Sequence, residues 1–281
     1  MSPVLRQRIV TALLLLAVLV PALFAGPRWP FTLIALLMIG AAGWEWARLN
    51  GQGHSASLVW GGALALACAF AAVAGWVEQP ARPVWWLTAL AWIAGGSAAL
   101  RAGPSHWLRL PAGARLGIGL ALLGAGWLAI VQSRAVGINF ILSVLCLVWM
   151  ADVAAYFGGR AFGRRKLAPG ISPGKSWEGV WSGVFGVALL ALVWSMVERG
   201  SGVDSTSLFV ALFDRIGHAA GVLVLVGLAA MSVVGDLVES LVKRAVGVKD
   251  SSGLLPGHGG VLDRIDALLP VFPIALAVVT L

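Results

Sequence analysis

The stretch AAGVLVLVGLAAMSVVGDLVESLVKRA, residues 219–245, passes from an apolar run into charged residues at Asp236. The run at 219–234 has the composition of a helix inside a lipid bilayer. The polar side chains after it recur every three or four residues, which places them on one face of a continuing helix. They are Asp236, Glu239, Ser240, Lys243 and Arg244. The stretch therefore predicts a helix that crosses a membrane and carries a polar stripe where it leaves the membrane.

Apolar runs of this kind recur along the whole chain. Of its 281 residues, 59% are hydrophobic and 11% are charged, whereas a soluble domain has about 25% charged residues. We expect nine spans, at residues 9–25, 31–47, 58–77, 84–100, 116–131, 138–157, 180–197, 219–234 and 267–281. The last is the weakest, because it is short and contains Pro270 and Pro273. The predicted fold class is an all-α, polytopic transmembrane helical bundle of about nine spans, and a soluble fold is excluded.

The basic residues predict how these spans are oriented. The chain has 20 Lys and Arg residues and a formal net charge of +8, but they lie in short segments between apolar runs. Membrane orientation explains them better than a nucleic-acid partner does. With a cytoplasmic N-terminus, the basic residues outside are only Arg28, Arg82, Arg134, Arg199 and Arg215. Because the other basic residues lie inside, we expect the N-terminus and residues 236–266 to be cytoplasmic.

The acidic residues are unevenly distributed. Only Glu45 and Glu78 lie in the first half, and the other acidic residues follow residue 140. We therefore divide the chain into N-terminal transmembrane helices, residues 1–140, and a catalytic transmembrane region, residues 141–281. Within the second region, the segment 235–266 concentrates acidic and basic side chains beside a span. Charged groups near a membrane span cost free energy, so this concentration indicates a functional site.

A glycine-rich turn follows the polar stripe. The sequence GLLPGHGG, residues 253–260, ends the helix with Pro256 and allows the backbone a tight turn. Asp263 and Asp266 come directly after it. If the turn folds them back beside Asp236, their carboxylates would converge, as a hard cation such as Mg²⁺ requires. The alternative is that these charges form ion pairs at a helix end.

Two stretches now resemble a known family. Residues 240–266, SLVKRAVGVKDSSGLLPGHGGVLDRID, resemble the signature of the phosphatidate cytidylyltransferases, also called CDP-diacylglycerol synthases. The matching positions are Ser240, Lys243, Arg244, Lys249, Asp250, His258, Gly259, Gly260, Asp263, Arg264 and Asp266. Residues 152–179 are similar to the family's other polar stretch. The first half of the chain matches only as a set of apolar spans.

The resemblance implies an activity, a cofactor and a location. The expected reaction transfers the cytidylyl group of CTP to phosphatidate, giving CDP-diacylglycerol and pyrophosphate in phospholipid biosynthesis. The family's metal ligands correspond to Asp236 and Asp263, with Asp266 close by. Mg²⁺ is the expected cofactor, and a second, monovalent cation such as K⁺ is left open. Membrane lipids are expected partners, and the family can form a homodimer. We expect a multi-pass protein of a bacterial inner membrane with its active site facing the cytoplasm.

The remaining candidates follow from the phosphates that the site must hold. Lys243 and Arg244 share a helix face with Asp236, so we expect these three to be catalytic together with Asp263 and Asp266. The expected substrate-binding residues are Lys175, Ser176, Ser240, Lys249, Asp250, His258 and Arg264. For His258, a loop hydrogen bond and a role as a base or ligand are both open.

Two other functions are compatible with parts of this pattern. A transporter would also place acidic side chains near the membrane, but here they gather at one cytoplasmic edge beside a glycine-rich turn. A CTP-dependent lipid kinase would use the same nucleotide and metal chemistry on a lipid alcohol. The motif match favours the cytidylyltransferase.

Overall fold

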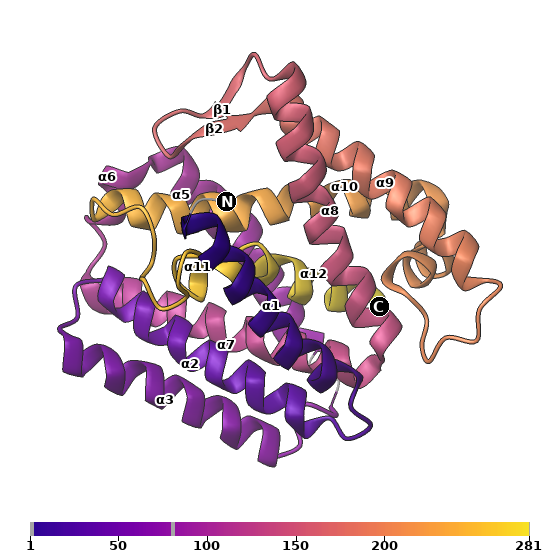
Figure 1. The fold of residues 1–281 in the computed structure, drawn as a ribbon, viewed down its shortest axis with the longest axis horizontal. Coiled ribbons are helices and arrows are strands. Elements are labelled where there is room, and N and C mark those ends of the chain that lie inside the picture. The colour runs from indigo at the N-terminus through magenta and orange to yellow at the C-terminus, as the bar shows by residue number, and fades with distance from the viewer. Residues whose placement is uncertain (1–2, 80–81, 281) are drawn as a thin grey trace.

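The computed structural model describes residues 3–79 and 82–280, and these are almost entirely helical (Figure 1). The elements in chain order are α1 Pro3–Phe24, α2 Trp29–Leu49, α3 His54–Val73, α4 Arg82–Leu90, η1 Ala91–Gly96, α5 Ser97–Ala102, α6 Pro104–Trp107, α7 Ala112–Val136, α8 Ile138–Phe162, β1 Lys166–Ala168, β2 Ser172–Ser176, α9 Trp177–Glu198, α10 Leu208–Ala245, α11 Leu262–Ile265 and α12 Leu268–Val279. The all-α prediction is confirmed.

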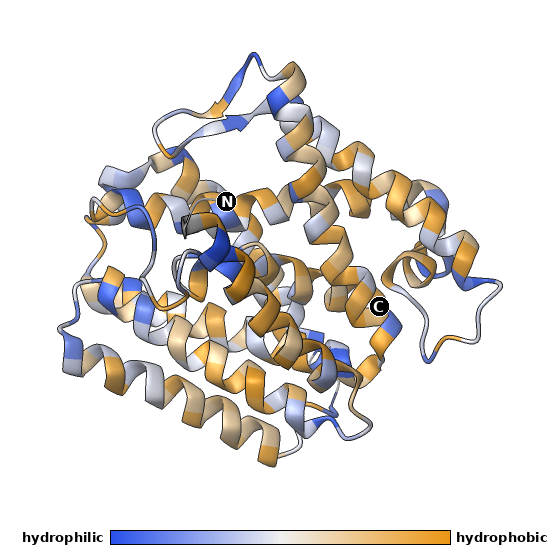
Figure 2. Cartoon of the chain, viewed as in Figure 1, coloured by the Kyte–Doolittle hydropathy of each residue, from blue (hydrophilic) through white to orange (hydrophobic). Residues whose placement is uncertain are grey.

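Eight helical segments in the described residues are long and apolar enough to cross a membrane. One of them, Arg82–Ala102, runs through α4, the π-helical segment η1 and α5 without a break. Along these helices hydrophobic residues predominate, and hydrophilic residues concentrate toward the helix ends and loops (Figure 2). Large apolar side chains such as Leu66, Phe185 and Leu223 are exposed, as expected of helices that face lipid. These eight segments match the first eight predicted spans.

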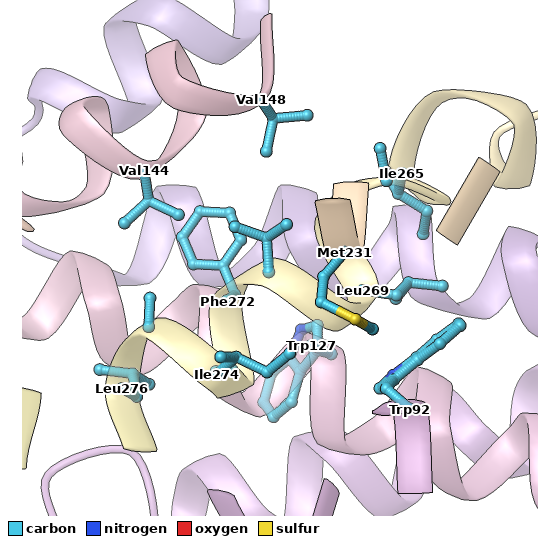
Figure 3. Packing of buried hydrophobic residues seen from close by; sticks show 14 of the residues in the cluster. Trp92, Trp127, Val144, Val148, Met231, Ile265, Leu269, Phe272, Ile274 and Leu276 are labelled. Atoms are coloured by element: carbon cyan, nitrogen blue, oxygen red, sulfur yellow. The ribbon is translucent and has the colours of Figure 1, made fainter. Parts of the chain in front are cut away.

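The ninth predicted span, residues 267–281, differs from the other eight. It contains α12, which has 12 residues and so rises only about 18 Å. Phe272 and Leu276 on this helix are fully buried, and α12 packs against α4, α7, α8 and α10 (Figure 3). A short helix that is apolar on every side is suited to a protein interior. The segment forms the centre of the bundle.

Helix α10 confirms the continuation predicted from the sequence. It extends past residue 234 as far as Ala245, so its charged end belongs to the same helix as its apolar part. The helix is interrupted near its start at Gly217, where φ is 75° and ψ is 167°. A positive φ favours glycine, which has no Cβ to clash with the backbone. The polar stripe is therefore carried at the end of a long helix that begins after this kink.

A small antiparallel hairpin, β1 with β2, extends beyond the helices (Figure 1). The hairpin was not predicted from the sequence. Its second strand leads directly into α9, and α9 packs closely along α8 because small residues line the contact. At Gly183, for example, a Cβ would lie 2.8 Å from the carbonyl oxygen of Ala151. This packing holds the hairpin at the same end of the bundle as the polar stripe.

The membrane orientation can be tested with single cysteines at two exposed positions. Val248 follows α10, and Val203 lies in the connection before it. In a variant without Cys68 and Cys146, Val248→Cys should be protected from an impermeant thiol reagent in intact cells, and Val203→Cys should be labelled. The reverse pattern would contradict a cytoplasmic polar stripe.

Candidate active site

The polar stripe of α10 meets the β-hairpin through an ion pair. Lys175 on β2 places its Nζ 2.6 Å from Oδ2 of Asp236. The other oxygen of Asp236, Oδ1, accepts a hydrogen bond of 3.2 Å from the Ser240 hydroxyl one helical turn later. Thus three of the predicted site residues, which come from two distant segments, lie together.

A second group forms one turn further along α10, around Lys243. Its ammonium contacts the carboxylate of Glu239 and lies 2.5 Å from Oδ1 of Asp263. Lys243 is only 8% exposed, and its ammonium is paired with these two side chains. Breaking such a buried pair by removing one partner is costly, because the other charge is left without compensation. The pair therefore fixes Asp263 against α10.

Asp263 also organises the glycine-rich loop. Its Oδ2 accepts hydrogen bonds from the backbone N–H of Ser251 at 3.0 Å, the Ser251 hydroxyl at 2.8 Å and the N–H of Gly260 at 2.7 Å. Burial would raise the pKa of Asp263, but hydrogen bonds and the charge of Lys243 lower it to about 2. Gly259 has a φ of 85°, so the loop turns where glycine permits it. The loop is closed around a carboxylate that stays ionised.

Asp266 lies beside Asp236. The backbone oxygen of Asp266 approaches Gly235 so closely that a side chain at Gly235 would collide with it. Burial and the negative charge of Asp236 raise the pKa of Asp266 to about 7. These two carboxyl groups therefore form a site that would favour a cation.

The three predicted metal ligands do not form one cluster with one another. Among residues 3–79 and 82–280, no group of three or more His, Cys, Asp or Glu side chains is arranged to hold a metal ion. Asp236 is paired with Lys175 and Asp263 with Lys243. Mg²⁺ in nucleotide-binding sites is commonly held by one or two carboxylates together with substrate phosphates. The pair Asp236 and Asp266 fits that arrangement.

The other predicted site residues lie around these groups in different ways. Arg244 donates to the backbone oxygens of Ile171 and Val248, at 3.3 Å and 3.1 Å. Ser176 is buried and caps α9 by accepting a hydrogen bond from the N–H of Gly179 at 3.2 Å. This contact gives Ser176 a structural role beside the predicted one.

Arg264 of α11 donates to the backbone oxygen of His258, in the loop, at 2.6 Å. Lys249 and Asp250 are exposed at the start of the loop. Their side chains therefore lie in positions that a soluble ligand could reach. Their predicted role in substrate binding stays a prediction.

Glu45, in the first half of the chain, is a site residue that the sequence analysis missed. It is fully buried on α2, and its carboxylate accepts four hydrogen bonds from residues on either side of the glycine-rich loop. The donors are the hydroxyls of Ser251 and Ser252 and the N–H groups of Val261, at 3.0 Å, and Leu262, at 2.7 Å. The signal was an acidic residue inside an otherwise apolar span, where such a residue is expected to have a specific partner.

Helix α1 holds the opposite side of the same loop. The Nε of Arg8 donates to the backbone oxygen of Gly257, and the Thr11 hydroxyl donates to that of Pro256, both at 2.9 Å. Because turns leave backbone oxygens without helical partners, these contacts satisfy acceptors that the loop cannot pair itself. The glycine-rich loop is thus held by α1, α2 and α10.

Comparisons with known proteins agree on one family. A model of the cytidylyltransferase family matches residues 6–281. The chain is 38% identical to a phosphatidate cytidylyltransferase of Pseudomonas aeruginosa over 282 residues, which cover 97% of this chain and 96% of that protein. It is 50% identical to a phosphatidate cytidylyltransferase of Haemophilus influenzae over 138 residues, 49% of this chain and 44% of that protein. A relative of the same name from Staphylococcus epidermidis is 39% identical over 155 residues, 55% of this chain and 54% of that protein.

Replacing Glu45 tests whether α2 holds the loop. Glu45→Gln turns a hydrogen-bond donor toward groups that are themselves donors, so we expect a loss of stability of about 1–3 kcal/mol. Activity should fall with it, because the loop that precedes Asp263 is released. Thermal unfolding in detergent and turnover measure the two effects. The matched control is Glu78→Gln, which changes the other acidic residue of this half, exposed on the surface. Equal behaviour of the two variants would contradict the role of Glu45.

Proposed function

The chain belongs to the cytidylyltransferase family, and we propose that Lys175, Asp236, Lys243, Asp263 and Asp266 form its catalytic centre. It transfers the cytidylyl group of CTP to phosphatidate, giving CDP-diacylglycerol and pyrophosphate in phospholipid biosynthesis. The observation that best supports the proposal is the pair of lysine–carboxylate contacts that α10 makes through Asp236 and, two helical turns later, through Lys243.

The reaction needs no covalent intermediate with the protein. An oxygen of the phosphatidate phosphate bonds to the α-phosphorus of CTP, and the bond between that phosphorus and the β-phosphate oxygen breaks. Pyrophosphate leaves with the electron pair. A phosphomonoester with a second pKa of about 6 is largely dianionic at neutral pH, so the nucleophile needs no general base. The enzyme must hold two repelling anions in line.

The lysines of the site are suited to that task. Lys175 and Lys243 each contact a carboxylate that fixes the position of the ammonium group. A phosphate that enters beside them finds cations already oriented, which favours the charge that develops in transfer. Arg244, Lys249 and Arg264 are exposed at the same end of the protein and would hold the outer phosphates.

Asp236 and Asp266 would hold Mg²⁺, with phosphates of CTP as further ligands, and Asp236 would then exchange its contact with Lys175 for the metal. When bound, the metal ion neutralises charge on the α-phosphate and on the departing pyrophosphate. Asp263, which the sequence analysis also proposed as a ligand, is bound to Lys243 and to three donors of the loop. In our proposal Asp263 orders the loop and reaches the metal only by giving up its contact with Lys243.

The protein is a multi-pass membrane protein. We propose that it lies in a bacterial inner membrane with the site facing the cytoplasm, where CTP is available. The basic residues support this orientation. The two sequence regions, 1–140 and 141–281, are proposed as a supporting part and a catalytic part of one bundle, and a homodimer remains a proposal from the family resemblance.

The fate of each phosphate of CTP tests the reaction. With purified protein, Mg²⁺ and phosphatidate, α-labelled CTP should yield labelled lipid, because the α-phosphate stays with cytidine. γ-Labelled CTP should yield labelled pyrophosphate and unlabelled lipid. A lipid kinase would instead move the γ label to a lipid alcohol, so the assay is repeated with diacylglycerol, and lipid that carries only the γ label would overturn the assignment.

Replacing Asp236 tests the proposed metal site. Asp236→Asn removes a charge with little change in volume, so turnover should fall by about a hundredfold or more, and half-maximal activity should need more Mg²⁺. The control is Asp214→Asn, which changes an exposed acid near the start of the same helix. Both variants should be checked for unchanged thermal unfolding. Normal activity of folded Asp236→Asn would exclude it as a ligand.

A further inference from the structure

A cavity of about 350 Å³ lies between α9 and α10, away from the candidate active site. Helix α9 starts directly after the β-hairpin and has 22 residues, so its far end is roughly 33 Å from the hairpin (Figure 1). The cavity is lined by residues of the second half of α9 and of α10 near its kink, and it shares none with the candidate active site. Its volume is within the range of cavities that hold small ligands, about 300–1,000 Å³.

Most of the cavity wall is apolar and opens to the surface of the bundle. Leu192 and Met196 line it from α9, Val222 lines it from α10, and all three side chains are exposed. Both helices are candidate membrane spans. An opening between them therefore faces the hydrocarbon of the bilayer, and a ligand that occupies this part needs an apolar chain.

The end of the cavity near the membrane boundary is basic and polar. Arg199, directly after α9, and His218, directly after the kink at Gly217, both line the cavity and are exposed. The His218 ring stacks on that of Phe213, with centroids 5.2 Å apart and an angle of 10° between the planes. Within residues 3–79 and 82–280, Arg199 forms no ion pair, and none of the residues that line the cavity is acidic. The guanidinium is thus available to an anion.

A third polar group lies one helical turn deeper on α9. Ser195 lines the cavity, and its hydroxyl oxygen is buried without a hydrogen-bond partner among the described residues. Buried polar atoms of native proteins usually have such a partner. A ligand oxygen at this depth would supply the missing one.

Polarity changes in the same order along both walls of the cavity. On α9, Arg199 and Ser195 are followed toward the membrane interior by apolar residues as far as Val184. On α10, His218 is followed by Val222 and Val226, at helical spacing on one face. A phospholipid has the same order of groups, with a phosphate, then ester oxygens, then hydrocarbon. The cavity therefore complements a phospholipid in composition and in direction.

We propose that this cavity binds an anionic phospholipid from the leaflet opposite the candidate active site. The lipid phosphate contacts Arg199 and His218, an ester oxygen accepts a hydrogen bond from Ser195, and one acyl chain lies between α9 and α10. A net negative lipid is favoured over a zwitterionic one, because the headgroup cation of a zwitterion offsets the attraction to Arg199. The inference concerns a second lipid site and does not depend on the proposed reaction.

Binding of defined lipids to the detergent-purified protein tests the selectivity. By native mass spectrometry, dioleoyl phosphatidylglycerol should bind at least tenfold more tightly than dioleoyl phosphatidylcholine. The double substitution Arg199→Ala and His218→Ala should remove this preference, because it removes charge-assisted hydrogen bonds to the phosphate. The matched control is Arg215→Ala, which removes an exposed basic residue of α10 that does not line the cavity. Equal affinity of the unchanged protein for both lipids, or the same loss in the control, would overturn the inference.

A cross-linking experiment locates the bound lipid without relying on the basic residues. Phosphatidylglycerol with a photoreactive group at the end of one chain should label residues 184–196 or 222–226. Filling the cavity with Ala188→Leu should reduce the labelling severalfold. Ala220→Leu, at an exposed position of α10 outside the cavity, should leave it unchanged. Labelling that is confined to other helices contradicts the site.

A second copy of the chain is the rival occupant of the same opening. Met196→Cys, in a variant without Cys68 and Cys146, distinguishes the two. If lipid occupies the opening, this cysteine should form no disulfide between protomers, and phosphatidylglycerol should slow its reaction with a thiol reagent. Efficient disulfide formation between protomers, with no protection by lipid, would show that protein covers the opening and would refute the proposal.

Discussion

The contact between Lys243 and Asp263 is the interaction on which the rest of the site depends. The ammonium lies almost out of reach of solvent between Glu239 and Asp263, so it holds the segment after the glycine-rich loop against α10. The second oxygen of Asp263 accepts hydrogen bonds from Ser251 and Gly260, and these contacts close the loop. A buried charge pair of this kind adds little to folding stability compared with apolar packing. It does restrict the positions that the two charged side chains can take. Its use here is to place acidic and basic groups beside one another before a substrate arrives.

The helical spacing of the polar stripe was enough to predict which side chains of α10 lie on one face. That prediction succeeds because it depends only on local geometry, and the helix continues to Ala245. The partners of the stripe could not be predicted in the same way. Lys175 reaches Asp236 through a hairpin of very short strands, whose positions depend on how α8 packs on α9. Periodicity in the sequence contains no information about such contacts.

Glu45 and α12 show two other limits. Glu45 is the acidic residue of α2 and is fully buried. The four groups that donate hydrogen bonds to its carboxylate lie about two hundred residues later in the chain. Spacing cannot reveal such a partner, although an acid in an apolar span indicates that one exists. For α12, composition alone does not separate a short span from a buried core helix, because both are apolar on every side. The contacts of the N-terminal helices show that the first half of the chain helps to position the loop.

The position of α12 has a consequence for how the protein is made. All eight candidate spans precede α12 in the chain, so a ribosome synthesises them first. Each can enter the bilayer on its own apolar length. The core between α4, α7, α8 and α10 is filled only when α12 docks into it. Until then the nascent protein is a set of inserted helices around an incomplete centre. Assembly of this enzyme in the membrane is therefore completed from the inside, after its outer helices are already in lipid.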